Sequence, residues 1–251
     1  HTGDISAEML ADAGANVLND YYDAVSGADD ANEGRISPFT GGARFIQDGR
    51  VSARDTFRYA LILTGIVIPC GIWLAQGSGA GLLLIGAAGL LIGWTYSAPP
   101  LQLMARGLGE LAIAMAWSLV VIGASYVQLH RIDTLPALLS LAYGLMVTNI
   151  LLVNGFPDAE SDAAVGKRTL VVRLGPRLAA LLYLLLAVAA HGWISAMIVL
   201  HWLPLAAAWG LLSLPLSGGQ PWLALVAFVG GLTAATGMVI VESIAVATMV
   251  S

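Results

Sequence analysis

Long apolar runs alternate with shorter polar segments along the whole chain. Most runs hold about 20 residues, which is the length of a helix that crosses the hydrocarbon core of a bilayer. They predict membrane-spanning helices over 57–75, 80–96, 108–128, 135–154, 178–200, 202–216 and 222–249. The alternating ten-residue pattern of transmembrane strands is absent from the sequence. The pattern therefore predicts an all-α, polytopic membrane helix bundle that forms one domain over residues 1–251.

The range 5–23 predicts an eighth helix of a different kind, because one of its faces is polar. Asn16, Asn19, Asp20 and Asp23 are spaced i, i+3, i+4, i+7, which places them on one side of a helix. Charge is costly in lipid, so this stripe is expected to face the bundle interior or a wet cavity.

Three polar loops, over 23–55, 97–107 and 155–177, are expected on one side of the membrane, because helices cross alternately. Ten of the 11 Lys and Arg residues fall in these loops or in the first turn of an adjoining helix. That bias predicts that the side is cytoplasmic. The net charge of −5 gives no electrostatic case for binding nucleic acid.

The acidic stripe on 5–23 predicts a cation site. Clustered carboxylates repel each other unless a cation lies between them, and hard oxygen ligands suit Mg²⁺. Magnesium keeps several waters and typically binds one or two carboxylates together with substrate phosphates. Asp20 and Asp23 are therefore candidate metal ligands.

A second acidic cluster repeats this pattern about 140 residues later. Asn154, Asp158 and Asp162 are spaced i, i+4, i+8 at the end of an apolar run, again on one helical face. Pro157 is expected to kink or restart the helix there. Two such clusters facing each other predict a site that holds Mg²⁺ around a diphosphate and neutralises a leaving group.

Basic residues near the two clusters are candidate phosphate ligands. Lys167 and Arg168 follow the second cluster, while Arg44 and Arg106 lie in the other polar loops. Arginine matches phosphate oxygens bidentately, and lysine acts as a point charge. Two features discriminate against a transporter that uses the acidic cavity as a cation path. Basic residues suited to phosphate lie beside both clusters, and the clusters lie at helix ends, whereas transporter sites lie near the midplane of the membrane.

The chain resembles the UbiA superfamily of membrane prenyltransferases. The resemblance rests on Asn16-x-x-Asn19-Asp20-x-x-Asp23 with Gly27-x-Asp29, and on Asp158-x-x-x-Asp162 with Gly166-Lys167-Arg168-Thr169. It implies a nine-helix bundle around a central cavity, of which about eight helices are expected here. The family's first helix is missing from this sequence, either by truncation or because the start is atypical.

The resemblance also implies Mg²⁺-dependent ionisation of a polyprenyl diphosphate and attack by an aromatic acceptor. It implies a bacterial cytoplasmic membrane as the location. The implied catalytic and metal-binding residues are Asp20, Asp23, Asp158 and Asp162. The implied diphosphate-binding residues are Asn16, Asn19, Arg44, Arg106, Asn154, Lys167 and Arg168.

Further segments are similar to the branch that prenylates 1,4-dihydroxy-2-naphthoate in menaquinone synthesis. They are Tyr96-Ser-Ala-Pro-Pro100 and Arg106-Gly-Leu-Gly-Glu110. The naphthoate is therefore the expected acceptor. Homogentisate, 4-hydroxybenzoate, chlorophyllide, haem and glycerol phosphate stay open as acceptors, as do the prenyl chain length, the oligomeric state and the role of Glu242.

Overall fold

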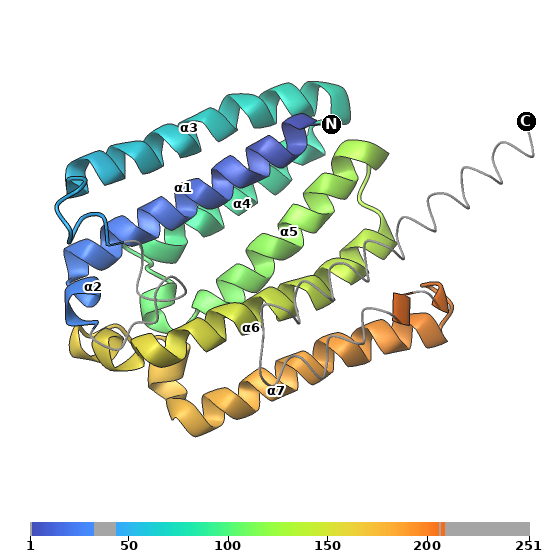
Figure 1. Cartoon of the computed structure of the whole chain (residues 1–251). Helices are drawn as coiled ribbons and strands as arrows, with labels where there is room; N and C mark the ends of the chain where they lie inside the picture. Colours follow the sequence, from blue (N-terminus) through green and yellow to red (C-terminus); the bar gives the residue numbers. More distant parts are fainter. Residues whose placement is uncertain (1, 33–43, 206, 209–251) are drawn as a thin grey trace, which may run out of the picture.

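The computed structural model describes residues 2–32, 44–205, 207 and 208, and all regular elements within them are helices (Figure 1). They are α1 (Thr2–Ser26), α2 (Ala28–Ala31), α3 (Ala53–Ser78), α4 (Gly81–Ser97), the 3₁₀-helix η1 (Met104–Arg106), α5 (Gly109–Leu129), α6 (Thr134–Ala164) and α7 (Leu170–Val199). The predicted all-α fold is confirmed for these residues.

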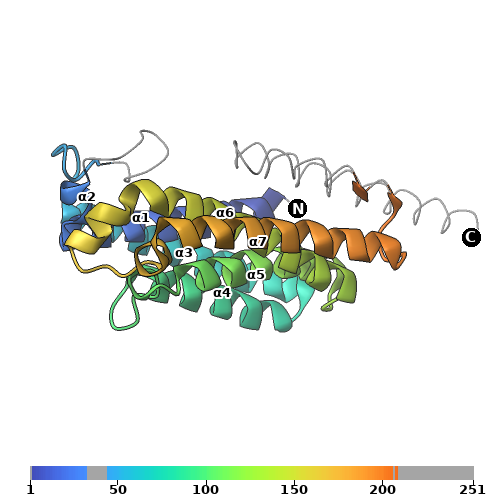
Figure 2. The same ribbon diagram turned by 90° about the horizontal axis from the view of Figure 1, so that it is seen from below.

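The long helices run back and forth, and each packs on its neighbour in the chain (Figure 1). α1 packs on α3 and also on α4, whereas α2 packs on α6. In the turned view, α4 and α5 lie beneath α1 and α6 (Figure 2). These contacts arrange α1, α4, α5 and α6 around a common interior, with α2 closing the gap between α1 and α6 at one end.

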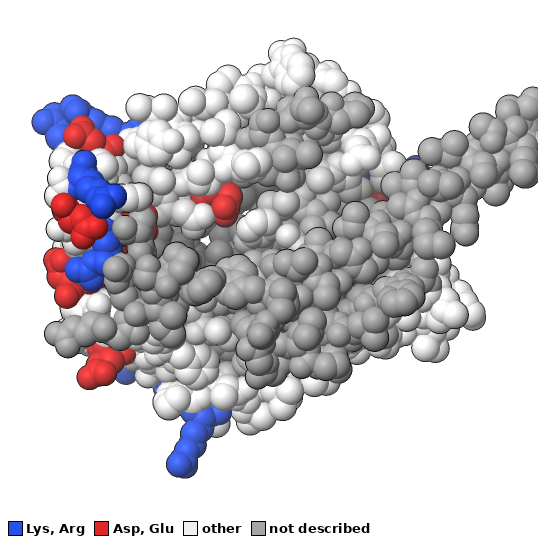
Figure 3. Space-filling view, in the orientation of Figure 1, with Lys and Arg blue, Asp and Glu red and all other residues white. Residues whose placement is uncertain are grey.

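The polar connections meet at the end of the bundle that carries α2. In the space-filling view, charged side chains gather over this end and are sparse over the rest of the described surface (Figure 3). The expectation that the three polar segments share one side is therefore confirmed for the described part of the chain.

Four described helices, α3, α5, α6 and α7, are long and apolar enough to cross a membrane. α4 is also apolar but has 17 residues, about 26 Å of helix, slightly short of a bilayer core of about 30 Å. The predicted spans at 202–216 and 222–249 fall largely or wholly outside the described residues, as does Glu242.

The predicted polar loop over 155–177 is wrong in extent. α6 continues to Ala164 although it contains Pro157, and α7 begins at Leu170, so a short turn joins the two helices. The proline removes one backbone hydrogen bond, but the last turns of α6 are held by packing, since Ser161 and Asp162 are buried and α2 lies against them.

α7 bends close to its start. Gly175 has φ 75° and ψ 163°, which is outside the helical region, and Pro176 follows it. Residues from 176 onward form the straight apolar helix that the sequence predicted over 178–200, and the turns before Gly175 carry the chain back toward α6. The bend therefore sets the direction in which the polar turn between α6 and α7 returns toward α6.

The first predicted loop, 23–55, is shorter than expected as well. α1 reaches Ser26, Gly27 turns the chain at φ 80°, and α2 follows at once. Such a positive φ is readily adopted by glycine because it has no Cβ. The turn brings α2 back over the polar end of the bundle.

α5 and α6 approach closely at Gly144. A Cβ atom on Gly144 would lie 2.7 Å from the Ala114 carbonyl oxygen and 2.8 Å from the Ser118 hydroxyl. Small residues allow this kind of close approach between membrane helices.

We expect Gly144→Val to destabilise the protein by about 1–3 kcal/mol, because α5 and α6 must separate to admit the side chain. The measurement is thermal unfolding of detergent-solubilised protein. Gly192→Val on α7 is the control, since a Cβ there meets nothing within 4 Å. Equal melting temperatures for the two variants would contradict close packing at Gly144.

Candidate active site

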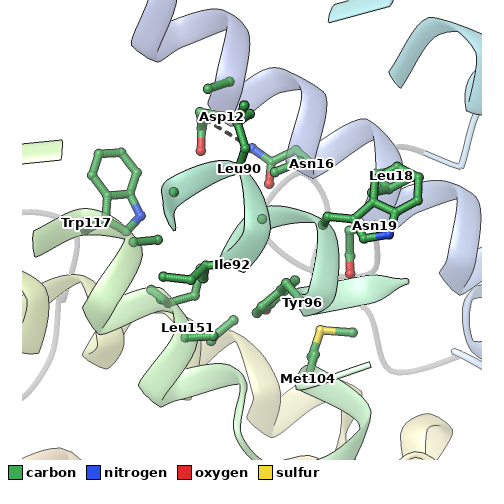
Figure 4. Close-up of a pocket in the computed structure, with 18 of the residues that line it drawn as sticks. Asp12, Asn16, Leu18, Asn19, Leu90, Ile92, Tyr96, Met104, Trp117 and Leu151 are labelled. Atoms are coloured by element: carbon green, nitrogen blue, oxygen red, sulfur yellow. Dashed lines mark hydrogen bonds between the residues drawn. The ribbon is translucent and has the colours of Figure 1, made fainter. Parts of the chain in front are cut away.

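A cavity of about 680 Å³ lies between α1, α4, α5 and α6. Its walls are mostly apolar, and Figure 4 shows Ile92, Tyr96, Trp117 and Leu151 around it, opposite the polar side chains of α1. One end of the cavity is polar, and the remainder could hold a hydrocarbon chain.

Both acidic clusters border this cavity. The lining residues from α1 include Asn16, Asn19 and Asp23, and those from α6 include Asn154, Asp158 and Asp162. The helical spacing seen in the sequence therefore brings these six residues, though not Asp20, to the wall of one cavity.

Lys167 joins the two clusters. Its ammonium group is paired with the Asp23 carboxylate and lies 3.6 Å from Oδ1 of Asp162. The lysine is 8% exposed, so these interactions are shielded from water. A single buried cation thus links α1 to the end of α6.

The turn that carries Lys167 is fixed through its backbone. The Lys167 amide donates to the Asp162 carbonyl at 2.9 Å, and the Arg168 amide donates to the Ala105 carbonyl at 2.9 Å. The second bond ties this turn to the loop between α4 and α5. These backbone hydrogen bonds therefore fix the position from which the Lys167 side chain extends.

Hydrogen bonds also hold Asp23 in place. Asn19 donates from Nδ2 to Oδ2 of Asp23 at 3.0 Å, and the Ser97 hydroxyl donates to Oδ1 of Asn19 at 2.9 Å. α4 thereby orients Asn19, which in turn orients the carboxylate of Asp23.

α2 is bound to its surroundings on two sides. Arg44 donates to the Asp29 carbonyl at 2.8 Å, and Gln47 donates to Oδ2 of Asp29 at 3.1 Å. On the other side, Asn32 donates from Nδ2 to Oδ1 of Asp158 at 2.7 Å. α2 therefore connects the first acidic segment to the second.

The carboxyl group of Asp29 lies in a strongly negative environment. Burial, followed by the nearby charges of Asp23 and Asp20, raises the pKa of Asp29 to about 6, against the opposing effects of Lys167 and Gln47. Negative charge is thus concentrated here beyond what one lysine balances, and the polar end of the cavity favours cations.

Not every predicted site residue lines the cavity. Asp20 is half-buried and is not among the lining residues, although its charge acts on α2. Arg44 bonds to the backbone of α2, Arg106 donates to the Pro100 carbonyl at 2.7 Å, and Arg168 is exposed. Their proposed roles as ligands stay predictions.

Four residues near the site were not among the site residues predicted from the sequence. Asn32 and Thr169 line the cavity, whereas Gln47 and Ser97 hold residues that line it. Asn32, Gln47 and Ser97 act through partners 126, 18 and 78 residues away, so neither helical spacing nor charge clustering identifies them. Thr169 was visible only as the last residue of a motif.

The donor set suits Mg²⁺ bound together with a diphosphate. In the described part of the chain, no three carboxylate or imidazole groups converge on one metal position, and Lys167 lies between two of the acids. Magnesium commonly takes one or two carboxylates and completes its shell with phosphates and water. The buried Thr169 hydroxyl lines the cavity without a hydrogen-bond partner, so it could donate to such a phosphate.

Comparison with known proteins points to one family. The UbiA prenyltransferase family model matches residues 5–225. The 1,4-dihydroxy-2-naphthoate octaprenyltransferase of Haemophilus influenzae is 34% identical over 74% of this chain and 65% of its own length. The Escherichia coli protein of that name is 35% identical over 64% of this chain and 53% of its own length.

A third relative is the 2-carboxy-1,4-naphthoquinone phytyltransferase of Synechocystis, 29% identical over 65% of this chain and 50% of its own length. The chain thus spans between half and two thirds of the length of these relatives. The comparison with solved structures gave no match to this chain. Since the family model covers most of the chain and its motifs border one cavity, the chain belongs to the UbiA prenyltransferase family.

Proposed function

We propose that this protein transfers a polyprenyl group from a polyprenyl diphosphate to 1,4-dihydroxy-2-naphthoate, with Mg²⁺ as cofactor, in menaquinone biosynthesis. The observation that carries the proposal is the meeting of the two acidic segments at Lys167. The names of the relatives support the naphthoate as acceptor. We place the site on the cytoplasmic side of a bacterial inner membrane, because the basic residues lie there.

In this proposal, the polar end of the cavity holds the diphosphate. Asp23, Asp158 and Asp162 hold the magnesium, and Asp20 adds negative charge beside them. When bound, magnesium neutralises the charge that develops on the departing diphosphate. Lys167 and the Thr169 hydroxyl bind phosphate oxygens from the α6–α7 turn.

Asn16, Asn19 and Asn154 line the cavity and offer amide groups to it. Arg44, Arg106 and Arg168 belong to the polar segments at the end of the bundle that carries α2, where their charge raises the local concentration of an anionic substrate.

The apolar part of the cavity holds the prenyl chain and excludes water. This exclusion matters because the C–O bond to the diphosphate breaks and leaves a carbon centre that water would capture. The acceptor ring attacks this carbon to form the new C–C bond. The attacked ring carbon then loses the group it carried, either a proton or its carboxyl group as CO₂, and the ring becomes aromatic again. Tyr96 and Trp117 line the cavity and offer aromatic surface to the acceptor ring.

The test is an assay of the protein in membranes with a labelled polyprenyl diphosphate and a panel of acceptors. We expect label to appear in prenylated naphthoate when Mg²⁺ is present and to be lost when it is chelated. Homogentisate and 4-hydroxybenzoate serve as alternative acceptors in parallel reactions. Absence of Mg²⁺-dependent transfer to every acceptor would overturn the proposal, and transfer to another acceptor would correct only the substrate.

A further inference from the structure

Asn32 occupies a position at the site that neither acidic motif includes. It follows α2 directly, is 6% exposed and lines the cavity. The residues next to Asn32 in the sequence do not explain why a polar side chain is buried here. The surroundings of its side-chain atoms Nδ2 and Oδ1 explain it.

The Asn32 amide can be oriented in only one way. Nδ2 lies 2.7 Å from Oδ1 of Asp158, and a carboxylate only accepts hydrogen bonds, so the NH₂ group must face it. Oδ1 of Asn32 then points elsewhere. It is buried and has no hydrogen-bond partner among the described residues.

The chemistry of this oxygen limits what can satisfy it. An amide oxygen accepts hydrogen bonds and binds cations, but it carries no proton to give to a phosphate. Hard oxygen atoms of this kind, carboxylate and side-chain carbonyl alike, are ligands for divalent cations. Thr169, the other buried polar group with no partner that lines the cavity, has a hydroxyl that can donate instead.

The segment that carries Asn32 is already held in position. Asp29, three residues earlier, accepts hydrogen bonds from Arg44 and Gln47. The backbone N–H of Asn32 donates to the backbone carbonyl of Asp29 at 3.4 Å. A ligand delivered from such a segment loses little conformational freedom on binding.

We propose that Asn32 is a further ligand and positioning residue of the metal site. Through Nδ2 it orients the carboxylate of Asp158, and through Oδ1 it binds the divalent cation, directly or through a coordinated water. This inference rests on the proposed function, since it assigns one more ligand to the same site.

Asn149 on α6 provides a matched control. It is also buried, donates from Nδ2 to a protein acceptor, the Tyr183 carbonyl, at 3.2 Å, and has an Oδ1 with no partner among the described residues. It differs in two respects, both of which concern the site: it is not among the residues that line the cavity, and its acceptor is a backbone carbonyl and not a carboxylate. Asn149→Ala therefore measures the effect of removing a buried side-chain amide away from the cavity.

The experiment measures Mn²⁺ binding to the purified protein by electron paramagnetic resonance, with inorganic pyrophosphate present and no prenyl donor. We expect Asn32→Ala to weaken Mn²⁺ binding about 10- to 100-fold, the usual effect of losing a residue that supports a metal ligand. Asn32→Asp retains an oxygen ligand but loses the NH₂ donor, so its affinity should lie between those of the Ala variant and the unaltered protein. Asn149→Ala should bind as the unaltered protein does.

Unchanged affinity in Asn32→Ala would overturn the proposal, as would equal losses in the Asn32 and Asn149 variants. If Asn32→Asp binds Mn²⁺ as weakly as Asn32→Ala does, the oxygen of residue 32 does not contact the cation, and the dual role of Asn32 is rejected. If the unaltered protein binds no Mn²⁺ with pyrophosphate, the metal-dependent reaction itself fails, and that outcome is distinct from a defect confined to Asn32. Melting temperatures recorded for all variants identify any that do not fold.

Discussion

Replacing Asp23 with alanine is expected to reduce prenyl transfer by a factor of at least about 100 to 1,000, which is the usual loss when a group that stabilises a transition-state charge is removed. Asp23 lines the main cavity and also the smaller one that adjoins it. It accepts from Asn19 and pairs with Lys167. Among the acids of α1 whose side chains the structure describes, only Asp23 both lines the cavity and contacts the second cluster.

The rate is measured in membranes with labelled polyprenyl diphosphate and normalised to the amount of inserted protein. Asp55→Ala is the control, because Asp55 lies at the same end of the bundle in an exposed pair with Arg58 at 3.3 Å. Exposed pairs contribute about 0–1 kcal/mol, so that variant should fold and turn over normally. Full activity of Asp23→Ala would refute the two-cluster mechanism.

Lys167→Met is expected to raise the KM for polyprenyl diphosphate at least about tenfold and to lower kcat, since one charged phosphate contact is commonly worth about 1.5–3 kcal/mol. The KM for the acceptor should change little. The same substitution removes the buried cation between Asp23 and Asp162 and leaves two carboxylates facing each other. Breaking such a buried pair typically costs about 3–5 kcal/mol of stability.

The two effects can be separated by magnesium. A divalent cation can replace the missing positive charge between the carboxylates, so the melting temperature of Lys167→Met should rise with Mg²⁺ concentration more than that of the unaltered protein. The weakened binding of the donor should persist at saturating Mg²⁺. Arg58→Met is the control for loss of a cation at an exposed position. A normal donor KM in Lys167→Met would show that the lysine is structural only.

The parts of the site that follow from local periodicity were predictable from the sequence. Asp158 and Asp162 lie four residues apart on a helix, so their shared face follows from 3.6 residues per turn, whatever the rest of the fold does. The same holds for Asn19 and Asp23 on α1. Apolar run lengths likewise predicted α3, α5, α6 and most of α7.

The parts that depend on contacts distant in sequence were not predictable. Asn32 and Asp158 are 126 residues apart, and Ser97 and Asn19 are 78 apart, and no pattern within one segment links them. Polarity was also a poor guide to helix ends. The end of α6 reads as a loop because it is polar, yet it is helical because that polar face is buried against α2.

The arginines illustrate a further limit. A guanidinium group near an acidic motif in the sequence can satisfy phosphate, but it can equally satisfy a backbone carbonyl. Arg106 bonds to a carbonyl of the loop between α4 and α5, and Arg44 bonds to one on α2. Both guanidinium groups are at the same end of the bundle as the site, but each would have to leave its carbonyl partner to bind a phosphate.

The contact between Lys167 and Asp23 also has a consequence for synthesis. The two residues are 144 positions apart, and chains elongate at about 5–20 residues per second, so Asp23 leaves the ribosome on the order of ten seconds before its partner. During that interval the nascent α1 holds an uncompensated acidic stripe at the membrane. The acidic end of α1 can therefore take its final place only after the turn that follows α6 has been synthesised.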